Sequence, residues 1–140
     1  MRFIKKYGLI FLAVAVLGGI LYLNRFSSQA KIAKGKELYK STCANCHGDT
    51  GEGLKKLIPP LAGNDYIPVH FNELPCIIRY GIKGEITVNG QTYNQPMPGL
   101  PDLEADEIKA IMDYMIHEWY PDLESPSPGK VSGKLGNCNE

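Results

Sequence analysis

The pattern of apolar and polar positions predicts helices in four parts of the chain. Residues 7–23 form an uncharged, mostly apolar run, and residues 30–44 place apolar positions among lysines. Residues 103–119 repeat apolar residues at helical spacing, with acids at the start, where they suit the positive end of the helix dipole. A shorter helix is predicted over residues 72–80, with Asn72 as its N-cap.

Turn-forming residues separate these helices. Asn89 and Gly90 lie between two short β-prone arms over residues 85–93, which is a strong signal for a hairpin. Glycines and two adjacent prolines over residues 48–64 predict a long ordered loop, and residues 96–99 are also expected to form a loop. The helices are thus joined by one short hairpin and by irregular chain.

Length and composition place these elements in one small domain with two appendages. The chain has 140 residues, of which 44% are hydrophobic and 21% charged, as in a globular protein. We expect an N-terminal segment over residues 1–29 that ends in a linker over 24–29, a domain over 30–120, and a tail over 121–140. The tail is rich in Pro, Ser and Gly and has no periodicity, so it is predicted to be irregular.

The N-terminal apolar run is a membrane-targeting signal. Arg2, Lys5 and Lys6 precede it, so the positive-inside rule predicts a cytoplasmic N-terminus and an extracytoplasmic domain. A helix of its 17 residues covers about 25 Å, enough for a short single-pass anchor in the inner membrane through residues 7–23. The alternative is a signal peptide cut after Ala30. Both place the rest of the chain in the periplasm or an equivalent compartment.

The charge distribution excludes one class of partner. The chain has 15 basic and 15 acidic residues, and the part after residue 23 keeps 12 basic against 15 acidic residues. Its basic residues form no dense run with interleaved aromatic side chains, so no nucleic-acid partner is expected. Lysines gather over residues 31–56 and acids over residues 102–124. This asymmetry of charge either steers a charged protein partner toward the domain, or the charged residues simply form two solvent-exposed helix faces.

One motif carries candidate chemistry. Cys43 and Cys46 are followed directly by His47, in the C-x-x-C-H pattern of covalent haem attachment. On a helical turn, two cysteines at this spacing point to one side, so both sulfurs can bond the vinyl groups at one edge of a porphyrin. The imidazole of His47 can then reach the iron.

Three other uses of two cysteines at this spacing are possible, but each either requires a feature that the sequence lacks or leaves a feature unexplained. A thioredoxin-like redox pair follows a strand, whereas a helix is predicted before Cys43. A structural zinc site needs four ligands, usually from a second paired motif, and the chain contains none. A plain disulfide fits the spacing but gives no role to His47 or to the glycine-rich loop that follows it.

Met97 is the candidate for a second axial ligand. It lies between two prolines, and a loop preset in this way can hold a weak thioether ligand at little ordering cost. Met112 and Met115 fall on the apolar face of the last predicted helix and are expected to pack in the core. The remaining histidines, His70 and His117, are expected at the surface or in hydrogen bonds. The predicted metal ligands are therefore His47 and Met97.

The order of these motifs from Ala30 to Tyr120 resembles class I cytochrome c. The motifs are residues 43–48, Gly51-x-Gly53, Pro59-Pro60-Leu61, Asn89-Gly90, Pro96-Met97-Pro98 and the last helix. The resemblance implies a small all-α domain around one haem c, bound covalently through Cys43 and Cys46, with its first and last helices crossing. It also implies an axial methionine before the last helix, at Met97.

The resemblance implies further roles around the haem. The ring of His47 should donate a hydrogen bond to the carbonyl of Pro59, because ligating imidazoles are commonly oriented in this way. Leu61 should pack against the porphyrin. Tyr93 and Arg79 are candidates for contacts with the haem propionates, or else belong to the hairpin surface and a helix surface.

Cys76 and Cys138 depart from the usual pattern of this family. In an oxidising compartment, cysteines that are not used for haem tend to pair. We therefore predict a Cys76–Cys138 disulfide that ties the tail to the domain. The alternative is two unpaired cysteines, with Cys76 buried as a small apolar residue.

Iron ligation by His47 and Met97 fills both axial positions, so electron transfer is the expected activity. No enzymatic reaction and no small-molecule substrate are expected; the partners are a donor and an acceptor protein in a respiratory-type chain. One alternative is a cytochrome subunit of a larger membrane oxidoreductase. Another is a haem-c gas sensor or enzyme in which the sixth ligand is displaceable.

Overall fold

The computed structural model of the chain describes residues 2–138, without the side chains of residues 2–6 and 9. Residue 1 and the last two residues of the expected tail lie outside it, as do the basic side chains Arg2, Lys5 and Lys6. The described chain divides into two units, one up to Lys31 and one from Ile32 onward.

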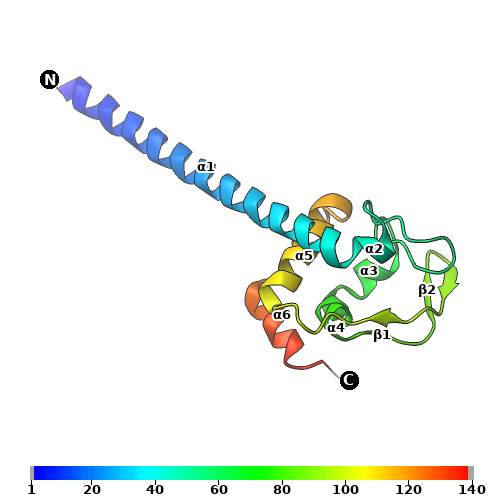
Figure 1. Cartoon of the computed structure of the whole chain (residues 1–140). Coiled ribbons are helices and arrows are strands. Elements are labelled where there is room, and N and C mark those ends of the chain that lie inside the picture. Colours follow the sequence, from blue (N-terminus) through cyan, green and yellow to red (C-terminus); the bar gives the residue numbers. More distant parts are fainter. Residues whose placement is uncertain (1, 139–140) are drawn as a thin grey trace. The chain divides into compact units, whose positions relative to one another are not determined.

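Helix α1 spans Arg2–Thr42 without a break, and its part up to Lys31 makes up the first unit (Figure 1). The described apolar side chains of this part are exposed, for example Phe11 at 76%. By length and composition, α1 contains a stretch apolar enough to cross a membrane, a test that a signal sequence also passes.

The linker expected over residues 24–29 is helical and continues α1 without a break. No glycine or proline occurs there to interrupt the hydrogen-bonded backbone. The hydroxyl of Ser28 also donates to the carbonyl of Asn24, one helical turn earlier, at 3.1 Å. Polar composition alone therefore did not mark a break in the helix.

The second unit is mainly helical, with two small antiparallel strand pairs. Besides the end of α1, its helices are α2 (Ala44–His47), α3 (Tyr66–Val69), a 3-10 turn (Phe71–Glu73), α4 (Leu74–Tyr80), α5 (Ala105–Trp119) and α6 (Pro128–Leu135). Its strands are β1 (Gly81–Ile82) paired with β4 (Met97–Pro98), and β2 (Ile86–Val88) paired with β3 (Gln91–Tyr93). The prediction of a helical domain with a short hairpin is confirmed.

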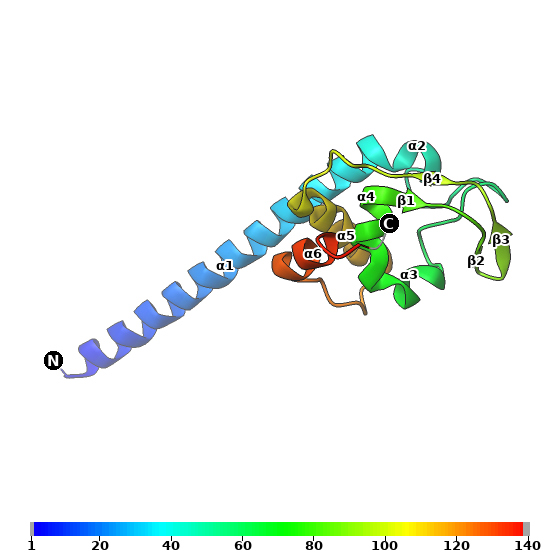
Figure 2. The same ribbon diagram turned by 90° about the horizontal axis from the view of Figure 1, so that it is seen from below.

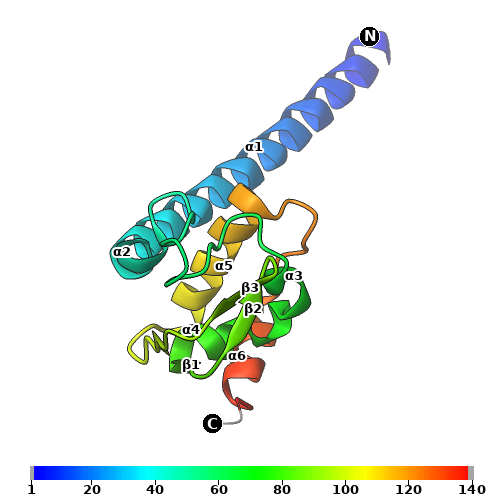
Figure 3. The same cartoon turned by 90° about the vertical axis from the view of Figure 1, so that its right-hand side faces the viewer.

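The hairpin forms where the Asn-Gly pair predicts it. Strands β2 and β3 lie side by side in Figure 3, with Ile86 opposite Tyr93. Asn89 and Gly90 have φ angles of +50° and +73°, as a tight two-residue turn requires. Asn89 also exchanges two hydrogen bonds with Asp65, at 2.7 and 3.0 Å. The hairpin is thereby tied to the chain just before α3.

Two predicted boundaries differ from the structure. Asn72 is not an N-cap, because it lies in the 3-10 turn and α4 begins only at Leu74. Pro75 does fall in the first turn of α4, as predicted. Proline is favoured there because the N–H groups of the first turn have no partner within the helix. The loop expected over residues 96–99 contains a short strand, because Met97 and Pro98 pair with β1.

The tail contains a helix, so the prediction of an irregular tail is wrong for residues 128–135. The hydroxyl of Ser127 accepts a hydrogen bond from the N–H of Lys130, and Pro128 occupies the first helical position. Both are start signals for a helix. Val131 is 1% exposed and packs in the core, so burial of this side chain stabilises a segment with little helical pattern.

Helices α1 and α5 cross at a glycine. A Cβ at Gly35 would collide with the carbonyl oxygen of Ala110 on α5 and would lie 2.9 Å from the Cβ of Tyr114. Met112 and Met115 are 1% and 5% exposed, so their predicted place in the core is confirmed. The core lies where α5 meets α1, α4 and α6.

Candidate functional site

The cysteine motif follows directly from the end of α1. Helix α1 ends at Thr42, and α2 is one turn that ends at His47. The N–H groups of Cys46 and His47 both donate to the carbonyl of Cys43, at 3.1 and 2.9 Å. This turn places Cys43, Cys46 and His47 next to one another in space.

The structure tests the alternative uses of the two cysteines. A helix precedes Cys43, unlike in a thioredoxin-like motif, and both Cys43 and Cys46 are free thiols. Within residues 2–138, no group of three or more His, Cys, Asp and Glu side chains could hold a metal ion. Burial raises the pKa of Cys43, so this thiol is mostly protonated at neutral pH.

His47 is buried and oriented by a single backbone contact. The side chain is 7% exposed, and its Nδ1 lies 3.0 Å from the carbonyl oxygen of Pro59. A carbonyl only accepts hydrogen bonds, so Nδ1 carries the proton and Nε2 keeps a free lone pair. Burial lowers the pKa of His47 despite this bond, which favours the neutral ring that can bind a metal. The predicted contact with Pro59 is confirmed.

The glycine-rich loop brings Pro59 to His47. Gly53 N–H donates to the carbonyl of His47 at 2.8 Å, and Leu61 N–H donates to the carbonyl of Gly51 at 2.7 Å. Gly53 has a φ of +71°, and a Cβ there would lie 2.5 Å from the carbonyl oxygen of Ile58. A side chain at this position would therefore open the loop.

His47 faces an apolar cavity of about 210 Å³ that adjoins a second one of about 100 Å³. Eight residues line both: Cys46, His47, Leu61, Ile67, Leu74, Ile77, Met97 and Pro98. Free thiols, an imidazole with an available lone pair and a thioether thus share a mainly apolar wall. This donor set and lining fit an iron porphyrin that is bound covalently.

Most of the other predicted site residues line the cavities. Met97 is half-buried on β4 and Leu61 lies in the loop, and both line the two cavities. Tyr93 lines the larger cavity, is 6% exposed, and donates its hydroxyl proton to the carbonyl of Lys55 at 3.4 Å. Pro59 contributes both its carbonyl and part of the lining.

The structure does not bring Arg79 to the cavity. Its Nη1 donates to the carbonyl of Pro101 at 3.1 Å. Arg79 follows Ile77 by two positions on α4, and two residues turn a helix by about 200°, so its side chain points away from the wall that Ile77 lines. The expectation of a propionate contact from Arg79 finds no support in this geometry.

The two histidines expected outside the site do lie outside it. The ring of His70 stacks on Tyr66 with centroids 4.0 Å apart. His117 is exposed, and its Nδ1 lies 3.1 Å from a carboxylate oxygen of Glu118. Neither side chain lines either cavity in the described part of the chain.

Sequence reasoning missed the part of the wall that α3 contributes. Ile67 is 3% exposed and lines both cavities, yet no helix is predicted around it. The side-chain oxygen of Asn64 accepts the N–H of Ile67 at 2.7 Å, a contact typical of a helix start. The signal available in the sequence was Asn64, a residue favoured at helix starts, three positions before the apolar Ile67.

Comparisons with known proteins agree with this geometry. The family model for cytochrome c matches residues 32–119. Cytochrome c-552 of Thermus thermophilus is 30% identical over 113 residues, which cover 77% of this chain and 70% of that protein. The cytochrome c subunit of a quinone alcohol dehydrogenase from Gluconobacter oxydans is 31% identical over 70% of this chain and 20% of its own length. A thiosulfate dehydrogenase of Stutzerimonas stutzeri is 53% identical over 38 residues, 24% of this chain and 12% of that protein.

Proposed function

Since the chain belongs to the cytochrome c family, we propose that it carries electrons through a single haem c bound by Cys43 and Cys46. The observation that carries this proposal is one apolar cavity wall that includes Cys46, His47 with a free Nε2, and Met97. The two sulfurs of the C-x-x-C-H motif would hold the porphyrin edge, and His47 and Met97 would bind the iron from the protein.

The residues around the cavity set the conditions for electron transfer. The bound haem would supply a one-electron couple. Pro59 keeps the imidazole of His47 in one orientation, so a change of charge requires little movement of this ligand. The apolar lining excludes water, and a thioether ligand favours the reduced iron, so we expect a fairly positive reduction potential.

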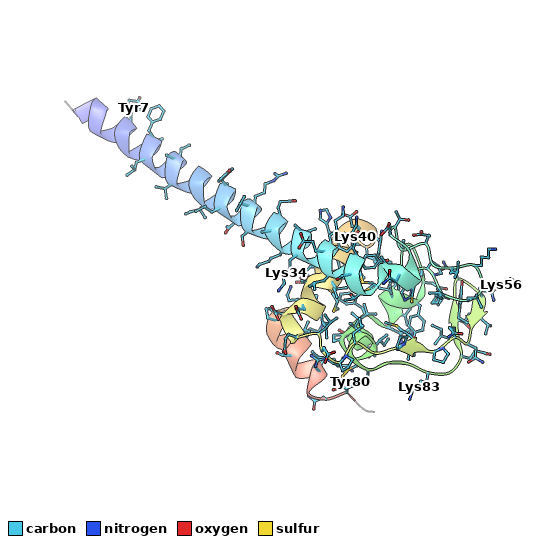
Figure 4. All side chains as sticks on the ribbon, in the orientation of Figure 1. Tyr7, Lys34, Lys40, Lys56, Tyr80 and Lys83 are labelled. Atoms are coloured by element: carbon cyan, nitrogen blue, oxygen red, sulfur yellow. A yellow bond between two sulfur atoms is a disulfide. The ribbon has the colours of Figure 1, made fainter. Side chains whose placement is uncertain are left out.

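The proposed partners are redox proteins and not small molecules. With Met97 and His47 both on the iron, no open position remains for a substrate. Lysines such as Lys56 and Lys83 are exposed on the second unit (Figure 4) and could steer an acidic partner. Lys34, however, lies 3.2 Å from Asp106, so part of the basic charge is offset within the chain.

We place the domain outside the cytoplasm, held at the inner membrane by residues 7–23. The apolar exposed part of α1 supports this placement. An anchored carrier would stay close to membrane-bound donors and acceptors. One relative is named as the cytochrome c subunit of a dehydrogenase, which supports a place for this chain as a carrier beside or within a larger oxidoreductase.

The test is an optical spectrum of the domain made with haem-maturation machinery, oxidised and reduced, with and without carbon monoxide. A low-spin c-type spectrum that carbon monoxide leaves unchanged is expected for ligation by His47 and Met97. Ready binding of carbon monoxide would instead support a sensor or enzyme with a displaceable sixth ligand. A chain with no covalent haem would overturn both.

A further inference from the structure

The segment that carries Met97 is held by the end of α4. Strand β4 pairs with β1 in the register that sets Met97 opposite Ile82. The N–H of Leu100 also donates to the carbonyl of Ile78 on α4, at 2.9 Å. Figure 2 shows β4 beside β1, which follows directly from α4. The backbone that bears the thioether is therefore held against the end of α4.

Two glycines permit this close contact. Gly81 has a φ of +79°, and a Cβ there would collide with the carbonyl oxygen of Met97. A Cβ at Gly99 would lie 2.5 Å from the carbonyl oxygen of Arg79. Glycine alone meets both demands without strain. A side chain at position 81 would push β4, and Met97 with it, away from β1.

Helix α4 is in turn tied to the end of the chain. Cys76 on α4 and Cys138 form a disulfide across 62 residues, so the predicted bridge is present. Helix α6 packs on both α4 and α5. Cys76 immediately precedes Ile77, which lines the two cavities. The bridge therefore joins the C-terminal segment to the helix that holds Met97.

We propose that α4 positions the sulfur of Met97, with Gly81 as the positioning residue, and that the Cys76–Cys138 bridge sets how firmly this sulfur is held on the iron. This inference rests on the proposed function, in which Met97 is the sixth ligand. A thioether binds weakly, so its occupancy depends on how well the backbone presents it. Without the bridge, α4 is less constrained against α5 and α6, and a competing ligand displaces Met97 more readily.

The first experiment measures the affinity of the oxidised holoprotein for imidazole, which competes with the thioether for iron. The Cys76→Ser/Cys138→Ser variant should bind imidazole roughly tenfold more tightly than the wild type. Ser125→Ala is the matched control: it removes a hydroxyl of the tail that contacts Lys109 and Asp113 but leaves α4 and the bridge intact. Its imidazole affinity should equal that of the wild type.

The second experiment tests Gly81 directly. The oxidised Gly81→Ala variant should keep its covalent haem and its helical circular dichroism but lose the charge-transfer absorption band of methionine-ligated ferric haem. Gly84→Ala is the control, because Gly84 also has a positive φ of +89° but open space around its Cβ position. This variant should keep the band. The comparison therefore distinguishes an effect of displacing β4 from an effect of backbone strain alone.

The outcomes distinguish the inference from the function on which it rests. A wild type that lacks the charge-transfer band and binds carbon monoxide would show that Met97 is not a ligand, and both proposals would fail. A wild type with the band, together with unchanged imidazole affinity in the double cysteine variant and an intact band in Gly81→Ala, would leave electron transfer standing and overturn the positioning role of α4.

Discussion

The chain holds its two proposed iron ligands in different ways. His47 is 7% exposed, and its ring donates a hydrogen bond to the carbonyl of Pro59. A contact of the side chain therefore fixes the orientation of this ring. Met97 is placed through backbone pairing with β1, and a thioether offers no strong polar contact to fix it further. At the scale of single residues, Met97 is therefore the ligand that substitution or competition should remove first.

Replacing Met97 by Ala should open the sixth position of the iron. We expect the reduced Met97→Ala protein to bind carbon monoxide and its midpoint potential to fall by on the order of 0.1 V, within the roughly 0.8 V range that haem ligation spans. Spectra with carbon monoxide and a redox titration measure both effects. Met112→Leu, a volume-conserving change in the core, is the control and should alter neither. An unchanged potential in Met97→Ala would exclude Met97 as the ligand.

Tyr39 should make stability fall at high pH. Its ring is fully buried, its hydroxyl donates to the carbonyl of Gly48 at 2.7 Å, and burial raises the pKa of the phenol well above its usual range. An unfolded tyrosine loses its proton near pH 10. The unfolded state is therefore favoured as pH rises beyond about 10, and the stabilisation is complete only below that pH.

The measurement is the free energy of unfolding against pH. Above about pH 10, the wild type should lose up to about 1.4 kcal/mol per pH unit more than Tyr39→Phe, which has no proton to lose there. Tyr80→Phe is the control, because it removes the hydroxyl of a 51% exposed tyrosine and leaves Tyr39 in place. Equal slopes for wild type and Tyr39→Phe would contradict the assignment.

At the scale of elements, the crossing of α1 and α5 depends on the missing side chain of Gly35. An added methyl group would meet the backbone of Ala110, which cannot turn aside as a flexible side chain can. Gly35→Ala should therefore lower the free energy of unfolding by about 1–3 kcal/mol, despite the better helix propensity of alanine. Denaturant unfolding of the holoprotein measures the change.

Gly133 in α6 provides the matched control for Gly35. A Cβ at Gly133 meets no atom within 4 Å, so Gly133→Ala should be neutral or should stabilise the protein by about 0.5–1 kcal/mol through helix propensity alone. If both variants changed stability in the same direction and by the same amount, close contact at the crossing would not be the cause.

At the scale of the whole molecule, the apolar part of α1 should keep the mature protein in the membrane. The full-length protein is expected in the membrane fraction, released by detergent but not by high salt, because apolar burial and not charge holds it there. The mass of the mature protein decides between anchor and signal peptide. A mature chain that begins after Ala30 and stays soluble in the periplasmic fraction would show that the segment is cleaved.

The sequence by itself indicated the candidate donor atoms of the site, the helices α1, α4 and α5, and the β2–β3 hairpin. The C-x-x-C-H motif, the proline-flanked Met97 and the Asn89-Gly90 turn are local patterns in which residue types a few positions apart fix geometry or donor atoms. The pairing of Cys76 with Cys138 was also predictable, since these were the two cysteines left after the motif. Short-range rules predict the motif, the Met97 loop and the turn because the atoms concerned are close along the chain, whereas the disulfide followed from elimination across 62 residues.

Apart from that disulfide, only the tertiary structure decided which residues meet across long separations in sequence. Helix α6 has a weak helical pattern and forms with Val131 buried in the core, and α3 brings Ile67 to the cavity wall. Arg79 turns away from the cavity, although the family resemblance made it a candidate for a propionate contact. The strand pairing of Met97 with Ile82 likewise depends on contacts at Gly81 that no short window of sequence contains. Burial and close approach are properties of the packed molecule, because they depend on neighbours that the fold alone brings together.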